Sequence, residues 1–135
     1  MEQIQASLLT IHSFVRWLIL SLALFGAARS FVSMLSVSAR FTRLDVGVSR
    51  AYAGLLDLQF LLGLLLVLGA LTLQETVPWI HPIVMIPAIV VAHLSRRFAA
   101  QPDRTRHQRQ LAIYLGNLAL IVLGLAVIGQ LYLPR

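Results

Sequence analysis

The chain has 135 residues, of which 59% are hydrophobic and 12% are charged. A soluble domain usually carries about 45–50% apolar and about 25% charged residues, so this composition excludes an ordinary soluble domain and is typical of an integral membrane protein. The sequence contains no cysteine, which excludes disulfides, thiolate metal sites and a covalently attached c-type haem. Any cofactor must therefore be held by histidine, methionine or carboxylate side chains.

Four long apolar segments divide the sequence. They cover residues 8–28, 51–73, 77–94 and 111–133, and each has the 18 or more mostly apolar residues that a helix needs to cross about 30 Å of hydrocarbon. Because only residues 74–76 separate the second segment from the third, those two helices must be antiparallel neighbours. The sequence predicts a single transmembrane domain over residues 1–135, folded as an all-α, up-down four-helix bundle.

The connections between these segments contain further helical signals. Residues 31–43 either extend the first helix or form a short amphipathic piece on the membrane surface. Pro102 followed by Asp103 is typical of a helix start, so we expect the fourth helix to begin ahead of its apolar segment. Pro87 removes a backbone amide inside the third segment and predicts a bend there.

Arginine predicts the orientation, because the chain has eleven arginines and no lysine, and arginine in short loops tends to stay in the cytoplasm. Nine arginines flank the connections after the first and third segments, and the opposite side has only Arg135. The nine are Arg29, Arg40, Arg43, Arg50, Arg96, Arg97, Arg104, Arg106 and Arg109. We therefore expect a multi-pass protein of the cell inner membrane with both termini outside. Arginine beside anionic lipid accounts for the net charge of +6, so nucleic acid is not an expected partner.

Two histidines occupy matching positions in the first and third segments. His12 and His81 each lie four residues inside the outer end of their segment, about 6 Å deep. In an up-down bundle these two helices are parallel and diagonal, at roughly 11–14 Å, which suits a metal-centred macrocycle between two imidazoles. Arg16 lies one turn below His12, where it can pair with a haem propionate, and Met85 lies one turn below His81, where it can pack on the ring or compete as a ligand.

The same residues have a purely structural interpretation. In that interpretation His12 lies at the membrane interface, and His81, which precedes Pro82, caps a helix start. Met85 is then an ordinary core residue.

Asp57 and His93 form a second candidate pair. Asp57 lies about 9 Å inside the cytoplasmic end of its segment and His93 about 4–5 Å inside its own. Side chains on a helix lean toward its N-terminus, which brings these two together, so we expect a buried Asp57–His93 pair. Arg16 is the alternative partner for Asp57, but it lies near the midplane and leans away. The pair either fixes the positions of the helices or passes protons between the cytoplasm and a quinone or haem site.

Other polar and aromatic side chains receive structural assignments. Gln59 and Asn117 are expected to form interhelical hydrogen bonds. We expect Tyr52 and Tyr114 in an aromatic belt at the inner interface, and His107 to be solvated in the arginine-rich connection.

Several short motifs of the first three segments resemble one group of proteins. They are Ile11-His12-Ser13 with Arg16-Trp17, then Leu56-Asp57-Leu58-Gln59 with Leu61-Leu62-Gly63, then His81-Pro82 with Met85 and His93. This combination resembles a group of small four-helix bacterial membrane proteins that are often labelled cytochrome b-like. The resemblance implies a non-covalent haem b. Some members carry histidine at the position of Asp57, so a ligand that they hold on the second helix is replaced here.

The sequence favours a small membrane redox subunit of the b-type cytochrome kind, with haem between His12 and His81, that passes electrons within a membrane complex. No stand-alone catalytic site is evident. The alternative is a non-catalytic structural accessory subunit of a larger respiratory or photosynthetic assembly. The lipid bilayer and other membrane subunits are the expected partners in both cases. A transporter built on Asp57 and His93 is less favoured, because four spans without repeats offer little machinery for alternating access.

Overall fold

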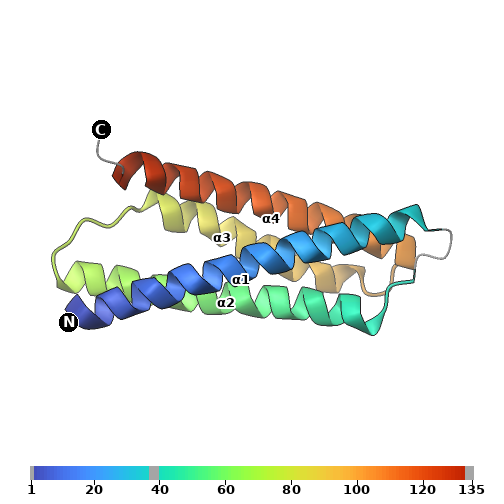
Figure 1. Ribbon diagram of the computed structural model, residues 1–135, viewed down its shortest axis with the longest axis horizontal. Coiled ribbons are helices and arrows are strands. Elements are labelled where there is room, and N and C mark those ends of the chain that lie inside the picture. The colour runs from blue at the N-terminus through green and yellow to red at the C-terminus, as the bar shows by residue number, and fades with distance from the viewer. Residues whose placement is uncertain (1, 37–39, 133–135) are drawn as a thin grey trace.

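The computed structural model is a bundle of four α-helices joined by short connections (Figure 1). The elements are α1 (Glu2–Leu35), α2 (Arg43–Thr72), α3 (Ile80–His93), the 3-10 helix η1 (Leu94–Phe98) and α4 (Asp103–Tyr132). The structure describes residues 2–36 and 40–132, without the side chains of residues 128 and 130–132. Arg135 and the last residue of the fourth predicted segment lie outside the described residues. The predicted all-α fold with four helices is confirmed.

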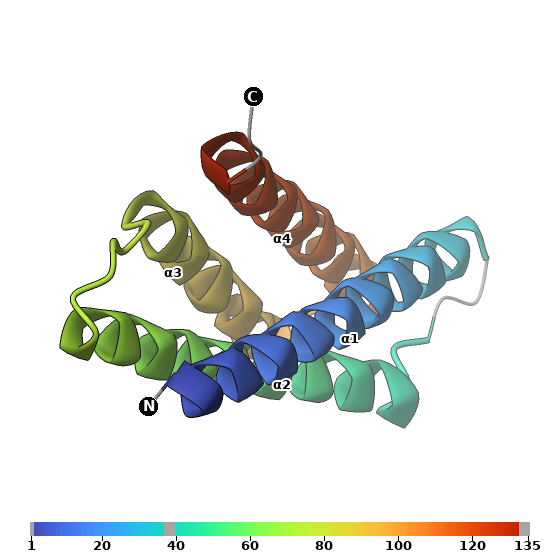
Figure 2. The ribbon, with the colours of Figure 1, turned by 60° about the vertical axis from the view of Figure 1, so that its left-hand side comes forward.

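The helices are arranged so that α1 and α3 stand at diagonal corners. α1 packs on α2 and α4, and α3 packs on the same two helices (Figure 2). The start of α1, the α2–α3 connection and the end of α4 lie at one end of the bundle (Figure 1). The α1–α2 connection and η1 lie at the other end, which is the arginine-rich end. This is the up-down order expected from the short connection between the second and third segments.

Two helices are longer than the apolar segments that they contain. α1 has 34 residues and continues to Leu35, so residues 31–35 extend the first helix and do not form a separate surface piece. At about 1.5 Å per residue its length is about 51 Å, well beyond the roughly 30 Å of a bilayer core. α4 begins at Asp103, directly after Pro102, as expected. The carboxylate of Asp103 is favourable there because the first turn of a helix carries positive charge.

α3 is shorter than the predicted segment of residues 77–94. Its 14 residues span only about 21 Å. Pro82 is tolerated because it lies in the first turn, where backbone amides have no partner in the helix, and Pro87 lies inside the helix. η1 adds five residues at about 2 Å each, so α3 and η1 together reach about 31 Å. Among the described residues, α1, α2 and α4 are each long and apolar enough to cross a membrane, and α3 alone is not.

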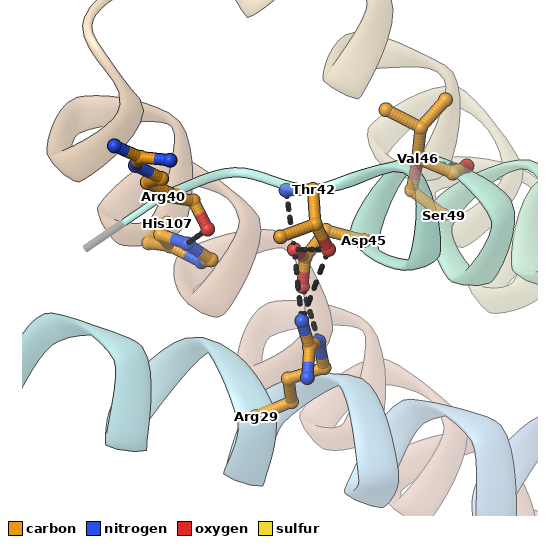
Figure 3. A network of polar contacts seen from close by, with 7 residues as sticks. All are labelled: Arg29, Arg40, Thr42, Asp45, Val46, Ser49 and His107. Atoms are coloured by element: carbon orange, nitrogen blue, oxygen red, sulfur yellow. Dashed lines mark hydrogen bonds and ion pairs between the residues drawn. The ribbon is translucent and has the colours of Figure 1, made fainter. Parts of the chain in front are cut away.

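A polar network at the N-terminus of α2 connects this helix to α1 (Figure 3). The backbone N–H of Thr42 and its hydroxyl both donate to Asp45 Oδ2, at 2.7 Å each. Arg29 on α1 donates from Nε to Asp45 Oδ1 at 2.6 Å and from Nη2 to Asp45 Oδ2 at 3.2 Å. At the other end, Gln74 has a φ of 58°, a left-handed conformation that commonly stops a helix.

Large apolar side chains cover the outside of the bundle, and small or polar ones fill much of its interior. Leu9, Phe14, Trp17, Phe60 and Leu61 are among the apolar side chains that are more than 40% exposed. Fully buried residues include Ala23, Ala88, His107 and Asn117, each with 0% exposure. A soluble monomer rarely exposes an apolar surface of this extent. The distribution is the one expected for a helical bundle surrounded by lipid.

Candidate functional site

Two imidazoles from the diagonal helices meet between the four helices. The ring centres of His12 on α1 and His81 on α3 are 6.5 Å apart, and the ring planes are inclined by 70°. Both side chains are partly buried. The two residues, at matching depth on diagonal helices, therefore lie close together inside the bundle.

Glycines on the other two helices lie against these rings. A Cβ atom at Gly63 of α2 would lie 3.5 Å from His12 Cε1, and one at Gly124 of α4 would lie 3.4 Å from His81 Nδ1. The Cβ at Gly124 would also collide with Met85 Cε, so Met85 lies close to His81. All four helices therefore contribute to the site, and α2 and α4 contribute bare backbone that leaves room for the rings.

Several buried polar atoms around the two rings have no hydrogen-bond partner in the part of the chain that the structure describes. They are His12 Nδ1, Arg16 Nε and Gln59 Oε1. The other half of the Gln59 amide is used, because Nε2 donates to the carbonyl oxygen of His12 at 3.0 Å. A buried polar atom without a partner costs about 1–3 kcal/mol, so a cluster of them marks a place where a ligand or water belongs.

Arg16 supplies positive charge at this site. Its charge acts on both imidazoles, and its guanidinium carbon lies 5.6 Å from the ring centre of Trp17. The ion pairs of the described residues join Arg29 to Asp45, His93 to Asp57 and Arg106 to Asp103. Because Asp57 pairs with His93, the alternative pairing of Asp57 with Arg16 is not formed. Arg16 is left beside the imidazoles, where an anionic group could balance it.

The expected Asp57–His93 contact is present, but the prediction that the pair is buried is wrong. His93 Nε2 and Asp57 Oδ1 are 2.9 Å apart, and their side chains are 35% and 52% exposed. The reason lies in the rotation of α2: Tyr52, Ala53 and Leu56 take its inner face, with Leu56 only 5% exposed, and the next residue therefore points outward. The pair lies on the outer surface of the bundle.

α4 has a buried face with several polar side chains, which the sequence did not predict. Tyr52 and Tyr114 are both 1% exposed with ring centres 5.2 Å apart, so they belong to the bundle core and not to an interfacial belt. His107 is fully buried, with Nε2 3.2 Å from the carbonyl oxygen of Arg40, and is not solvated (Figure 3). A usable signal is the spacing of His107, Gln110, Tyr114 and Asn117, which places all four on one helical face once α4 begins at Asp103.

Comparison with models of protein families, with curated proteins and with solved structures gives no match for this chain. The chemistry of the site is therefore judged from its own residues.

The site offers two imidazoles, the side-chain group that most often binds a metal ion in proteins. No cluster of three or more His, Cys, Asp or Glu side chains that could hold a metal ion occurs among the described residues. Two protein donors suit a metal whose remaining ligands come from a macrocycle.

Proposed function

We propose that this chain is a small membrane-spanning redox protein of the b-type cytochrome kind, with one haem held non-covalently between His12 and His81. The observation that carries the proposal is the 6.5 Å spacing of two imidazoles on diagonal helices. The buried Arg16 Nε adds support, because it has no hydrogen-bond partner among the described residues and could donate to an anionic group of a cofactor.

Each residue around the two rings has a stated role in this proposal. His12 and His81 would hold the haem iron through their imidazole nitrogens, and His81 Nδ1 lies next to the backbone of Gly124. Arg16 balances a carboxylate at the edge of the site. Met85 lies close to His81, and its unbranched thioether side chain could repack around a bound group. When bound, haem supplies one-electron transfer at a potential set by two imidazoles and an apolar surrounding.

The proposed location is the cell inner membrane, with both ends of the chain outside. The apolar exterior of the bundle supports burial in lipid, and the connections rich in arginine lie together at one end (Figure 1). Other membrane subunits are the proposed partners, because a chain of 135 residues with one redox centre needs a donor and an acceptor.

The test is the visible absorption spectrum of the protein purified from cells supplied with haem. The wild type should give the reduced spectrum of a low-spin b-type haem, and His12→Ala and His81→Ala should each lose it or become high-spin. His93→Gln is the matched control, because it changes a histidine outside the site, and its spectrum should equal that of the wild type. A colourless wild type, or an unchanged spectrum in both His12→Ala and His81→Ala, contradicts the proposal.

The second candidate function is a structural accessory subunit of a larger membrane assembly. It is favoured by the Asp57–His93 pair, which lies on the outside of the bundle within apolar segments, where a charged group is costly unless a neighbour covers it. Under this function Asp57→Leu should release the chain from its assembly during purification, and Asp103→Asn should not. A colourless protein that shows this behaviour would favour the accessory function over the redox one.

A further inference from the structure

A pocket at the arginine-rich end of the bundle lies between α2, η1 and α4. Its volume is about 250 Å³. Its polar lining consists of Ser49, Arg50, Ser95, Arg96, Arg106 and Gln110. A second pocket of about 400 Å³ adjoins it, since both are lined by Phe41, Val46 and Arg50. Arg43 lines this second pocket.

Positive charge in the first pocket is not compensated within it. Arg50, Arg96 and Arg106 come from three different elements, and no carboxylate occurs among the described residues that line the pocket. Arg106 is held in position because its guanidinium carbon lies 3.9 Å from the ring centre of Phe41. Its contact with Asp103 is long, 3.7 Å, and Asp103 is 43% exposed, so this pair neutralises little of the charge. Three arginines around one pocket repel one another unless an anion balances their charge.

The pocket lies where the apolar segments end. Arg50 directly precedes the second apolar segment, and Arg96 follows the last residue of α3 by three positions. In a membrane-spanning orientation this is the level of the lipid headgroups. The walls of the pocket also include the apolar side chains of Val46, Ala53 and Phe98, which suit the glycerol and first methylene groups of a lipid.

We propose that this pocket binds the phosphate of an acidic phospholipid. Guanidinium groups bind phosphate oxygens with paired N–H donors, and the Ser95 hydroxyl lies in the same lining. A free phosphate ion offers the same oxygens, but only a lipid also fills the apolar walls and arrives at headgroup level. This inference rests on membrane insertion and is independent of haem at His12 and His81.

The experiment measures lipid binding to the full chain in detergent by native mass spectrometry, with phosphatidylglycerol or cardiolipin, with phosphatidylcholine and with inorganic phosphate. The variant is Arg50→Gln with Arg96→Gln, two exposed residues that line the pocket. The matched control is Arg97→Gln with Arg104→Gln, which removes the same charge from exposed residues at the same end of the chain. A direct hydrogen bond from a guanidinium group to a phosphate contributes about tenfold or more to affinity, so the pocket variant, which removes two such groups, should bind about 100-fold more weakly.

The expected result is binding of acidic lipid to the wild type and to the control, with the loss confined to the pocket variant. An equal loss in the control overturns the inference, because general charge would then explain the binding. Equal binding of phosphatidylcholine also overturns it. Displacement of the acidic lipid by inorganic phosphate at the same concentration would show that the site takes a free anion and would overturn the assignment to lipid. The helical circular dichroism signal of every variant must equal that of the wild type.

Discussion

Replacing Asp45 with asparagine removes the charge at the centre of the network that ties α1 to α2 (Figure 3). Asp45 is 5% exposed, and its two carboxylate oxygens accept hydrogen bonds from Arg29 and Thr42. Asparagine keeps the size of the side chain but has only one oxygen and no charge. Arg29 would then lose its ion-pair partner, and α2 would lose part of its N-terminal cap.

The expected cost is about 3 kcal/mol of unfolding free energy. Removing one partner of a buried ion pair costs about 3–5 kcal/mol, and the lower end applies because the Arg29 side chain is 30% exposed and retains some hydration. The matched control is Asp103→Asn. Its carboxylate is 43% exposed and lies 3.7 Å from Arg106, so the change should cost less than about 1 kcal/mol.

The assay is reversible unfolding of the purified protein in detergent or lipid, followed by circular dichroism. A double-mutant cycle that combines Asp45→Asn with Arg29→Met should show the two changes to be coupled, because the second change removes the guanidinium group that the first leaves unpaired. If Asp45→Asn and Asp103→Asn cost the same, or if the double mutant equals the sum of the single changes, the reasoning about this network is refuted.

Three further predictions concern other parts of the bundle. The losses of unfolding free energy caused by Asp57→Leu and His93→Leu should add up to about 0.5–1 kcal/mol more than the loss in the double mutant, a small coupling because the pair is partly exposed. Full additivity in the same unfolding assay would show that the two residues are not coupled. A reporter active only in the cytoplasm, fused after Arg135, should give no signal, and strong activity there would reverse the topology. Gly26→Ala should lower the unfolding free energy by about 1–3 kcal/mol, because the added Cβ collides with the buried Tyr114 ring. Gly54→Ala, with open space around it, should be neutral or stabilising, and equal effects of the two changes would contradict the packing.

The parts of the structure that depend on periodicity and spacing can be predicted from the sequence. Four helices, their up-down order and the helix start at Asp103 follow from apolar runs, a short connection and a Pro-Asp pair. The equal depth of His12 and His81 follows from the apolar segments, whereas the approach of their rings also requires both side chains to face the interior of the bundle.

The rotation of each helix about its axis is the feature that the sequence leaves open. Both faces of these helices are apolar, so a contrast between polar and apolar faces does not show which side turns inward. For this reason the Asp57–His93 contact follows from depth and lean, but its position on the outer surface does not. The same limitation applies to Tyr52 and Tyr114, whose place in the core depends on packing against α1 and on the exact start of α4.

Electron paramagnetic resonance of the oxidised protein tests the pairing of His12 with His81 most directly. Two imidazoles on one haem iron give a low-spin ferric signal, and removing one of them opens an axial position and gives a high-spin signal. The wild type and His93→Gln should therefore show the low-spin signal, and His12→Ala and His81→Ala should lose it. Imidazole added to either alanine variant should restore the low-spin form. A low-spin signal that persists in both alanine variants without added imidazole, or a wild type without haem, would contradict haem ligation by this pair.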